Sequence, residues 1–374
     1  VPDGVAFPDS ALQVRQLLRD RLTFGMIIGI PVMQLLLFGF AINADPKNLP
    51  AAVLAADNSL YARSFVRAME NSGYFRMVAQ VNSAREADEL LAHGEVQFVL
   101  SIPEDFSRKL ARGERAQLLL EADATDPSAT NNAISTLQAL AATALVRDLD
   151  GPLADTNAVA PPIDLRVHRR YNPEGVTAYN IVPGLIGTIL TMTMVLMTGL
   201  AMTRERERGT FENLLSTPAL PIEVMTGKIV PYVLIGLIQV TLIFLAARFV
   251  FGVPMRGNLF LLYCVVLLFI AANLTLGITF SSMARNQLQA MQMTFFFFLP
   301  SILLSGFMFP FRGMPEWAQW LASGLPLTHF LILVRGIMLK GTGLEELWPQ
   351  VWPILVFMLA VILIGLRFYK RTLD

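Results

Sequence analysis

The stretch at residues 257–284, GNLFLLYCVVLLFIAANLTLGITFSSMA, runs for 28 residues without Asp, Glu, Lys, Arg or His. A helix needs about 20 mostly apolar residues to cross the hydrocarbon of a bilayer, where each backbone polar group must be paired within its own segment. We therefore predict that this stretch spans a membrane. The whole chain agrees, since 54% of its 374 residues are hydrophobic and 16% are charged, against roughly 25% charged in soluble domains.

Charge-free intervals of similar length recur along the chain and predict a membrane α-helical fold with six transmembrane helices. The other five intervals are residues 22–44, 175–203, 229–247, 286–311 and 347–366. A seventh interval, 317–334, contains Gly324 and Pro326 near its middle, where a helix break is costly in hydrocarbon. We interpret residues 312–346 as a re-entrant or interfacial segment.

Basic residues beside the intervals predict that both termini face the cytoplasm, because short cytoplasmic flanks carry an excess of Lys and Arg. They are Arg15, Arg19 and Arg21 before the first interval, Arg204, Arg206, Arg208 and Lys228 after the second, and Arg367, Lys370 and Arg371 after the last. Residues 1–21 then form a cytoplasmic amphipathic segment. The interval 22–44 lacks a small-residue cleavage site, so we expect it to remain in the mature protein.

The segment 45–174 falls on the outer side and is predicted to fold as a small extracytoplasmic α/β domain between the first two transmembrane helices. It holds more than half of the charged residues. Short apolar runs that alternate with helical patterns predict strands at residues 51–56, 75–81, 96–102, 116–120 and near 164–169. Ser83 and Glu86 have the spacing of a capping box, and a long helix is predicted at 127–149.

The sequence contains no motif for nucleotide binding or hydrolysis. The pair Gly227 and Lys228 is followed by Ile229 rather than by the Ser or Thr of a phosphate-binding loop, so we expect this chain to bind no ATP and no other cofactor. A lone cysteine, Cys264, rules out an intrachain disulfide or a multi-thiolate metal site. A formal net charge of zero argues against nucleic acid as a partner. Three scattered histidines are interpreted as surface or interface residues: His93, His168 and His329.

The charged run RERERGTFENLLSTP at residues 204–218 has a pattern of its own. Alternating Arg and Glu extend the second transmembrane helix into water, where opposite charges can pair at helical spacing. Farther along, Phe211, Leu214 and Leu215 lie on one face of a short amphipathic helix that ends before Pro218. Such a face on the cytoplasmic side needs a surface to cover it, either the lipid or a partner protein.

The longer run RERERGTFENLLSTPALPIEVMTGKIVPY, residues 204–232, resembles the signature of permease subunits of type-2 ABC exporters, a family that exports drugs, lipids and polysaccharides. The sequences YNPE at 171–174 and LPLTH at 325–329 are similar to the same family, and the domain after the first helix is most like the subgroup with an enlarged outer domain. The resemblance implies a dimeric permease, formed with itself or with a sister chain, in a bacterial inner membrane.

The same resemblance implies two copies of a separate ATP-binding-cassette ATPase, which would use ATP and Mg, and a gating element in this chain that receives their motion. The implied coupling residues are Arg204, Glu205, Arg206, Arg208, Gly209, Thr210, Phe211, Glu212, Leu214 and Leu215. The position of the outer domain suits either a periplasmic adaptor or the exit of the transport pathway. An amphipathic, drug-like or lipid-like substrate is expected to leave the cell by this route.

Polar or aromatic groups within the apolar intervals are candidates for the lining of that pathway: Thr188, Thr191, Gln239, Asn273, Gln292 and Phe296. The alternative interpretation, which we favour for most of them, is packing and hydrogen bonding between helices.

Three other classes of function remain to be compared with a permease. A membrane-anchored receptor or assembly scaffold would bind a partner through its outer domain, but it has no need of the charged and amphipathic run at 204–218. An intramembrane enzyme or a proton-coupled carrier needs ionisable groups within its spans. The six intervals contain none.

Overall fold

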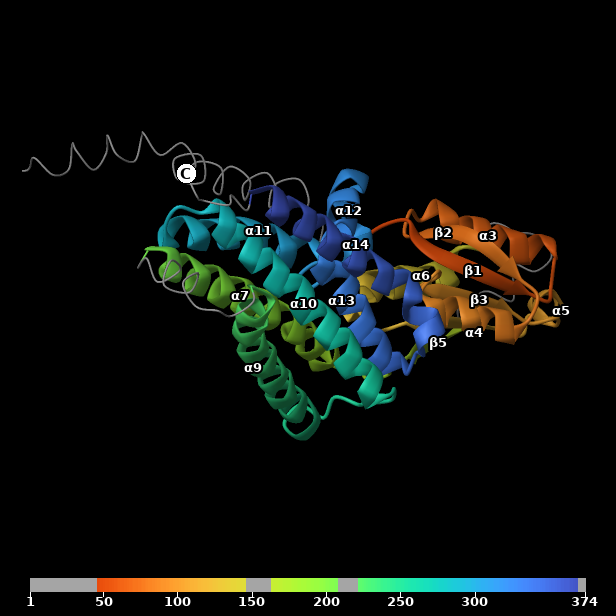
Figure 1. Ribbon diagram of the computed structural model, residues 1–374. Coiled ribbons are helices and arrows are strands. Elements are labelled where there is room, and N and C mark those ends of the chain that lie inside the picture. Colours follow the sequence, from red (N-terminus) through yellow and green to blue (C-terminus); the bar gives the residue numbers. More distant parts are fainter. Residues whose placement is uncertain (1–45, 146–162, 208–220, 369–374) are drawn as a thin grey trace, which may run out of the picture.

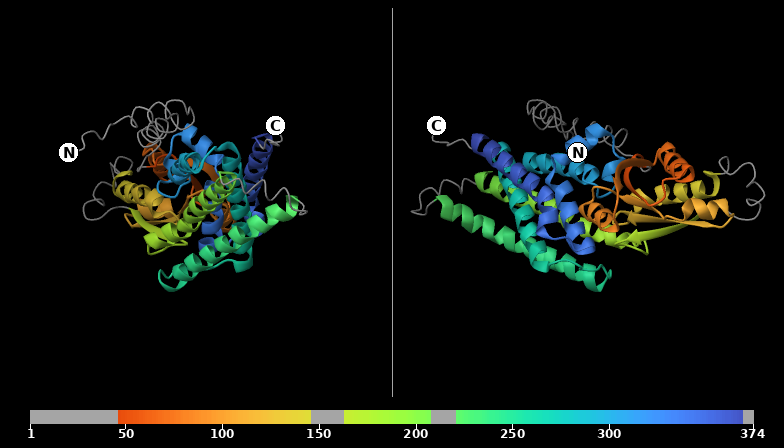
Figure 2. Two further views of the ribbon diagram at one scale, coloured as in Figure 1. Left: turned by 60° about the vertical axis from the view of Figure 1, so that its left-hand side comes forward. Right: turned by 90° about the vertical axis from the view of Figure 1, so that its right-hand side faces the viewer.

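The computed structural model describes residues 46–145, 163–207 and 221–368. The molecule is elongated, with a sheet domain at one end and long apolar helices at the other (Figure 1, Figure 2). The predicted amphipathic segment 1–21 and the first predicted transmembrane helix, 22–44, lie outside the described residues.

The sheet domain contains a five-stranded sheet with the strand order β2-β1-β3-β4-β5. The strands are β1 (Leu49–Ala55), β2 (Phe75–Val81), β3 (Phe98–Ile102), β4 (Ala116–Asp123) and β5 (Ile163–Arg170). Neighbouring strands run parallel except for β3 and β4, which are antiparallel. All five strands coincide with the predicted apolar runs, so the prediction of a small α/β unit is confirmed.

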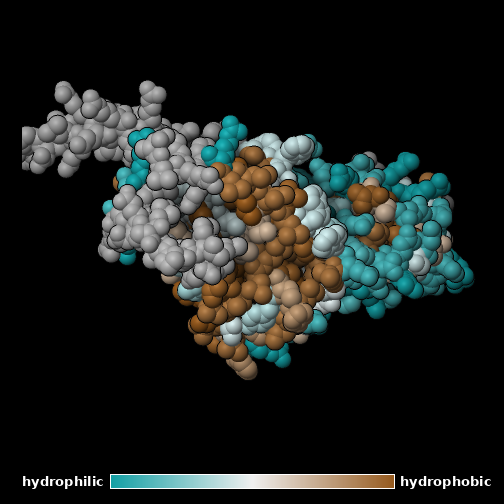
Figure 3. Space-filling view, in the orientation of Figure 1, coloured by the Kyte–Doolittle hydropathy of each residue, from teal (hydrophilic) through white to brown (hydrophobic). Residues whose placement is uncertain are grey.

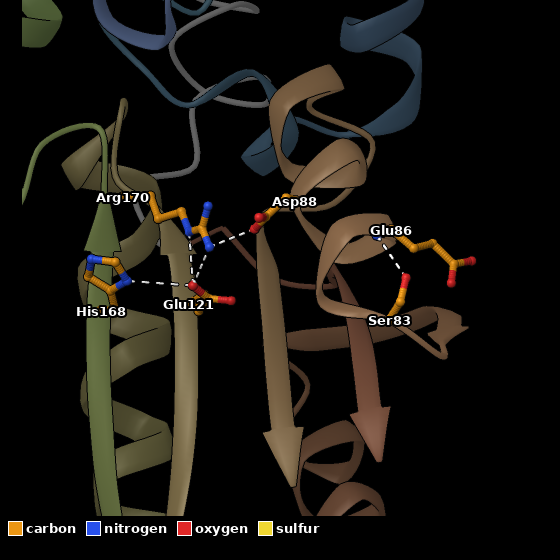
Figure 4. Close-up of polar contacts among 6 residues, drawn as sticks. All are labelled: Ser83, Glu86, Asp88, Glu121, His168 and Arg170. Carbon is orange, nitrogen blue, oxygen red and sulfur yellow. Dashed lines mark hydrogen bonds and ion pairs between the residues drawn. The ribbon is translucent and has the colours of Figure 1, made fainter. Parts of the chain in front are cut away.

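Helices cover both faces of this sheet. The helices α3 (Leu60–Asn71), α5 (Phe106–Ala111) and α6 (Pro127–Thr143) share one core with it, and α4 (Ala84–His93) packs on the opposite face. The predicted capping box begins α4, where Ser83 Oγ accepts a hydrogen bond from Glu86 N at 3.2 Å (Figure 4). Gly94 ends it with a φ of 73°, a left-handed conformation that glycine adopts without strain.

Five long apolar helices form the other end of the molecule. They are α7 (Thr177–Glu207), α9 (Pro221–Phe249), α10 (Leu259–Met283), α11 (Gln287–Leu304) and α14 (Leu344–Phe368). Each is long and apolar enough to cross a membrane, and each coincides with a predicted interval. The brown surface in Figure 3 covers these helices, whereas the sheet domain is mostly teal. The helix α11 is shorter than predicted, because the chain turns at Gly306, whose φ is 82°.

Two short helices follow α11. They are α12 (Glu316–Ser323) and α13 (Pro326–Arg335), preceded by the 3-10 turn η3 (Phe311–Gly313) and followed by the π-helix η4 (Gly336–Lys340). The chain bends by 85° between α12 and α13, which together have the length and apolarity of one span. The bend lies at Gly324 and Pro326, the residues that predicted a broken segment.

Small residues bring α7 and α10 into close contact. A methyl group on Gly277 of α10 would lie 2.9 Å from the carbonyl oxygen of Val195 in α7. Nearby, Thr203 Oγ1 donates to Ser281 Oγ at 3.1 Å. Close approach of backbones and hydroxyl bonds between helices are the usual means of association in lipid.

Candidate functional site

The predicted pathway residues on α7 use their hydroxyls within the helix. Thr188 Oγ1 donates to the carbonyl of Gly184 at 3.1 Å, and Thr191 Oγ1 donates to that of Gly187 at 2.9 Å. Both side chains are buried. Back-bonding of this kind satisfies a hydroxyl without a ligand, so these contacts fit packing at least as well as a pathway.

The other pathway candidates lie on three further helices. Gln239 of α9 accepts a hydrogen bond from Thr193 of α7 at 3.0 Å. Asn273 of α10 is fully buried, with Nδ2 bonded to its own helix and Oδ1 without a partner among the described residues. Gln292 of α11 likewise has a buried Oε1 without a described partner, and Phe296 is 42% exposed on the surface of α11.

Three cavities among the described residues are not lined by these six residues. The cavities of about 1310, 450 and 530 Å³ are lined by residues of the sheet domain and of the segment from Ser305 onward. The pathway role of the six residues therefore stays a prediction.

The predicted coupling element lies largely outside the described residues. Arg204, Glu205 and Arg206 belong to the last turn of α7, and Arg208, Gly209, Thr210, Phe211, Glu212, Leu214 and Leu215 fall in the gap at 208–220. The structure shows one contact at this end of α7 that the sequence did not indicate. The carboxylate of Glu207 accepts hydrogen bonds from the backbone N–H of Gln287, at 2.8 Å, and from its side chain, at 2.5 Å.

This contact joins the end of α7 to the start of α11. A carboxylate is favoured at a helix N-terminus because the first N–H groups have no partner within the helix. The hydrogen bonds from the side chain and the backbone of Gln287 hold the pKa of Glu207 below its usual range. The contact therefore links the last residue of α7 to the first residue of α11.

A second group of contacts joins the sheet domain to the helices. Lys340, the last residue of η4, forms an ion pair with Asp123 Oδ2 at 2.6 Å and donates to the carbonyl of Leu91 at 3.1 Å. Its ammonium also lies 5.2 Å from the ring centre of Tyr171. Burial, with the nearby charge of Asp123, raises the pKa of Tyr171 to about 12. We call this group the junction cluster.

Two more hydrogen bonds flank the junction cluster. Arg312 donates to the carbonyl of Gly94, and Asn180 of α7 donates to Asp126 at 2.9 Å. The sheet domain is thus held at three places by α7, by η3 and by η4. Sequence reasoning missed all three, because the partners are between 54 and 218 positions apart in the chain.

The histidines are separated in the structure as predicted. His93 bonds to the carbonyl of Glu89 at 2.7 Å, and His168 lies 3.5 Å from Glu121. His329 contacts Gln350 at 2.7 Å and the carbonyl of Ser323 at 2.8 Å, and so ties the bend between α12 and α13 to α14. Among the residues that the structure describes, no three His, Cys, Asp or Glu side chains are placed to hold a metal ion.

Comparison with known proteins gives a family match over nearly the whole chain. Residues 21–367 match the model described as "ABC-2 family transporter protein". The chain is 30% identical over 369 residues to "Probable multidrug ABC transporter permease YbhS" of Escherichia coli, with 97% of this chain and 96% of that protein covered. It is 29% identical over 344 residues to "Probable multidrug ABC transporter permease YbhR" of the same organism, with 92% of each covered.

A third relative is "Inner membrane transport permease YhhJ" of Escherichia coli, 28% identical over 365 residues, with 92% of this chain and 93% of that protein covered. The apolar helices and these relatives indicate a multi-pass protein of the bacterial inner membrane. The family implies an ABC ATPase as partner and a dimeric permease. From the match over residues 21–367, the chain belongs to the ABC-2 family of transporter proteins, as a homologue of bacterial ABC transporter permeases.

Proposed function

We propose that this chain is the membrane-spanning permease subunit of an ABC exporter. It moves an amphipathic, drug-like or lipid-like substrate outward, with energy from a separate ATPase subunit that binds ATP and Mg. One observation carries the proposal: the family match extends over residues 21–367, while the 374 residues contain no phosphate-binding loop. The energy must therefore come from another domain or chain.

The coupling element in this proposal is the run from Arg204 to Leu215. Closure of the ATPase subunits pushes on Phe211, Glu212, Leu214 and Leu215, and α7 carries the motion into the membrane. The described end of α7 supports this route, because Glu207 is hydrogen-bonded to the first residue of α11. Two of the helices that would move together are thus linked at their ends. The two nucleotide states shift the permease only if they contact its two conformations differently.

The proposed topology has six transmembrane helices with both termini in the cytoplasm and the domain 45–174 in the periplasm. Residues 22–44 supply the first helix, and α7, α9, α10, α11 and α14 supply the others. The bent pair α12 and α13 is then re-entrant or interfacial rather than a seventh span. Its 85° bend and the basic flanks at Arg204 and Arg367 favour this arrangement. The periplasmic domain either contacts an adaptor or shapes the exit of the pathway.

Replacement of Glu212 by Arg tests the coupling. We expect the variant to insert and to bind its ATPase, but to lose transport of a fluorescent amphipathic dye in inside-out vesicles while ATP hydrolysis continues. The control is Glu114→Arg, a reversal of the same charge on the exposed surface of the sheet domain, which should transport normally. Normal transport by Glu212→Arg would refute the coupling assignment.

The topology is tested separately with single cysteines on a Cys264→Ser background. Ala84→Cys, at the exposed start of α4, should react with a membrane-impermeant maleimide added to intact spheroplasts. Lys370→Cys, at the basic C-terminal flank, should react only after lysis. Labelling in the opposite pattern would invert the proposed orientation.

A further inference from the structure

A large cleft opens between the edge of the sheet and the segment that precedes α13. Its volume is about 1310 Å³. One wall comes from the starts of β1 and β2 and the end of α4, and the other comes from η3 and the first turn of α12. Figure 1 shows α12 on the side of the apolar helices that is next to the sheet domain. Neither wall belongs to the coupling element or to the predicted pathway residues.

Cationic side chains from both walls face this cleft. Arg76 of β2 comes from the sheet, and Arg312 of η3 comes from the opposite wall. One Nη atom of Arg312 donates to the carbonyl of Gly94, which holds the guanidinium in place. Burial holds the pKa of Arg312 below its usual range; the charge of Asp123 opposes this effect and that of Arg76 adds to it. The cleft is thus lined by two guanidinium groups, one from each wall.

Neither arginine forms an ion pair with a carboxylate of the described residues, although Glu95 and Glu316 also line the cleft. The same molecule shows what an arginine does when an anion is within reach. Arg170 holds Glu121 Oε1 with Nε at 2.9 Å and Nη2 at 2.6 Å, and it also contacts Asp88 at 2.6 Å (Figure 4). Two like charges that face one hollow are stabilised by an oxyanion that both can contact.

The position of the cleft adds a second constraint on the ligand. The helix α12, which forms one rim, exposes Trp320 at 83%, Leu321 at 58% and Trp317 at 45%. Tryptophan with exposed apolar neighbours is typical of the boundary between hydrocarbon and water, where lipid headgroups lie. An anion that reaches the cleft at this level is either a headgroup phosphate or a free oxyanion from the aqueous phase.

We propose that the cleft between the sheet edge and α12 is a binding site for a phosphate group, held between Arg76 and Arg312. The site stands apart from the transport proposal, because it needs neither ATP nor the coupling run. A phosphodiester of an anionic phospholipid and inorganic phosphate share the chemistry that the two guanidinium groups recognise. The experiment below distinguishes between them.

Binding is measured on the purified full-length chain in mixed micelles, by energy transfer from its tryptophans to dansyl-labelled phosphatidylglycerol, with dansyl-labelled diacylglycerol, which has no phosphate, as the neutral reference. We expect the wild-type chain to prefer phosphatidylglycerol. Arg312→Gln should weaken that preference about tenfold, and the more exposed Arg76→Gln about threefold, since bonds to charged groups are strong but are screened by water. The control, Arg115→Gln, changes an exposed arginine directly before β4 and should leave the preference unchanged.

Inorganic phosphate is then titrated against the labelled lipid at constant ionic strength. Displacement of the lipid by phosphate, with sulfate as a second oxyanion, supports a site that takes free phosphate as well. Retention of the lipid in phosphate supports a site for the headgroup of a membrane lipid.

Equal affinity for the two lipids, or an equal loss in Arg115→Gln and Arg76→Gln, would overturn the proposal. The variant Arg76→Gln guards against a folding artefact, because Arg76 is exposed and no described contact depends on it. Its thermal unfolding midpoint without anionic lipid should equal that of the wild-type chain.

Discussion

The sheet domain and the apolar helices satisfy their polar groups in different ways. In the sheet domain, side chains with opposite charges meet across strands, as Arg170 does with Glu121, and serine or aspartate side chains bind free backbone N–H groups. Within the helices, hydroxyl groups donate hydrogen bonds to the backbone carbonyl one turn earlier, as in Thr188 and Thr191. Water can replace a lost contact in the first region but not in the second. A buried polar pair at the boundary between the two regions, which water does not reach, is therefore expected to have a larger energetic effect than an exposed pair.

The junction cluster lies at that boundary and gives the largest expected effect. Lys340→Met leaves the Asp123 carboxylate, which is 7% exposed, without its counter-charge. We expect the free energy of unfolding to fall by about 3 kcal/mol, as is typical when one partner of a buried ion pair is removed. Denaturation of the purified chain in detergent measures the change.

The control for this variant is Lys109→Met, which breaks the more exposed pair between Lys109 and Asp105 on α5. Lys109→Met should lower the free energy of unfolding clearly less than Lys340→Met does, because water screens the exposed pair. Equal losses of stability in the two variants would show that the ion pair of Lys340 contributes no more than an ion pair on the surface of the sheet domain.

Close packing of the helices gives the next effect. Gly277→Val places a branched side chain where even a methyl group would lie 2.9 Å from the carbonyl oxygen of Val195 and 3.0 Å from Cβ of Thr198. We expect a loss of about 2 kcal/mol in stability from overpacking, measured by the same denaturation. The matched variant Gly343→Val has open space around its Cβ and should change little. If Gly277→Val were as stable as Gly343→Val, the two helices could not be in close contact.

A pH experiment addresses the sheet domain alone. The Asp57 carboxylate accepts hydrogen bonds from the backbone N–H groups of Ser59 and Ser107, each at 2.7 Å. Burial opposes its ionisation, but the hydrogen bonds from Ser107 and Ser59 together outweigh burial and lower the pKa of Asp57 below 3.8. Because the pKa of Asp57 is lower in the folded chain than in the unfolded chain, its ionised carboxylate stabilises the fold at pH values above the pKa of the unfolded state. This contribution is lost as the pH falls through about 4 and below.

We therefore expect Asp57→Asn to cost about 1 kcal/mol at neutral pH and to show a shallower loss of stability below about pH 4. Exchange of the Ser107 amide hydrogen, followed in the full-length chain, reports on this site. An unchanged pH profile in the variant would mean that other carboxylates determine the acid sensitivity.

The smallest expected effect on stability comes from Gln239, and the variant also tests whether this residue serves helix packing or the transport pathway. Gln239→Leu removes the acceptor for Thr193, which keeps a 2.7 Å bond to the carbonyl of Ile189. A loss of about 0.6 kcal/mol is typical of one polar contact between membrane helices. Dye export with an unchanged KM would assign Gln239 to packing, whereas a raised KM would place it on the pathway.

Local sequence patterns predicted the helices and strands, but they did not predict contacts between residues far apart in the chain. The apolar intervals located α7, α9, α10, α11 and α14, and the spacing of Ser83 and Glu86 located the start of α4, because these signals reside in neighbouring residues. The pair Lys340 and Asp123 is 217 positions apart and follows no local pattern. A positive φ at Gly306 likewise shortened α11 without a signal in its apolar sequence.

The candidate site was predicted less completely than the fold. The coupling run was predicted from its charge pattern and from the family resemblance, and its role stays a prediction. Glu207 was not singled out, because its partner is Gln287, 80 positions later. The charges of Arg76 and Arg312 are visible in the sequence, yet only the fold brings them to one cleft.

The register of β4 and β5 has a mechanical consequence. Their last paired residues are Asp123 and Arg170. Asp123 is bound to Lys340 at the end of η4, and Arg170 leads within a few residues into α7. Two separate parts of the membrane region, η4 and α7, are thus attached to the two residues of one paired position in the sheet. A change in the position of α7 relative to η4 would therefore act on this pair of strands, unless the two attachments of the sheet domain moved together.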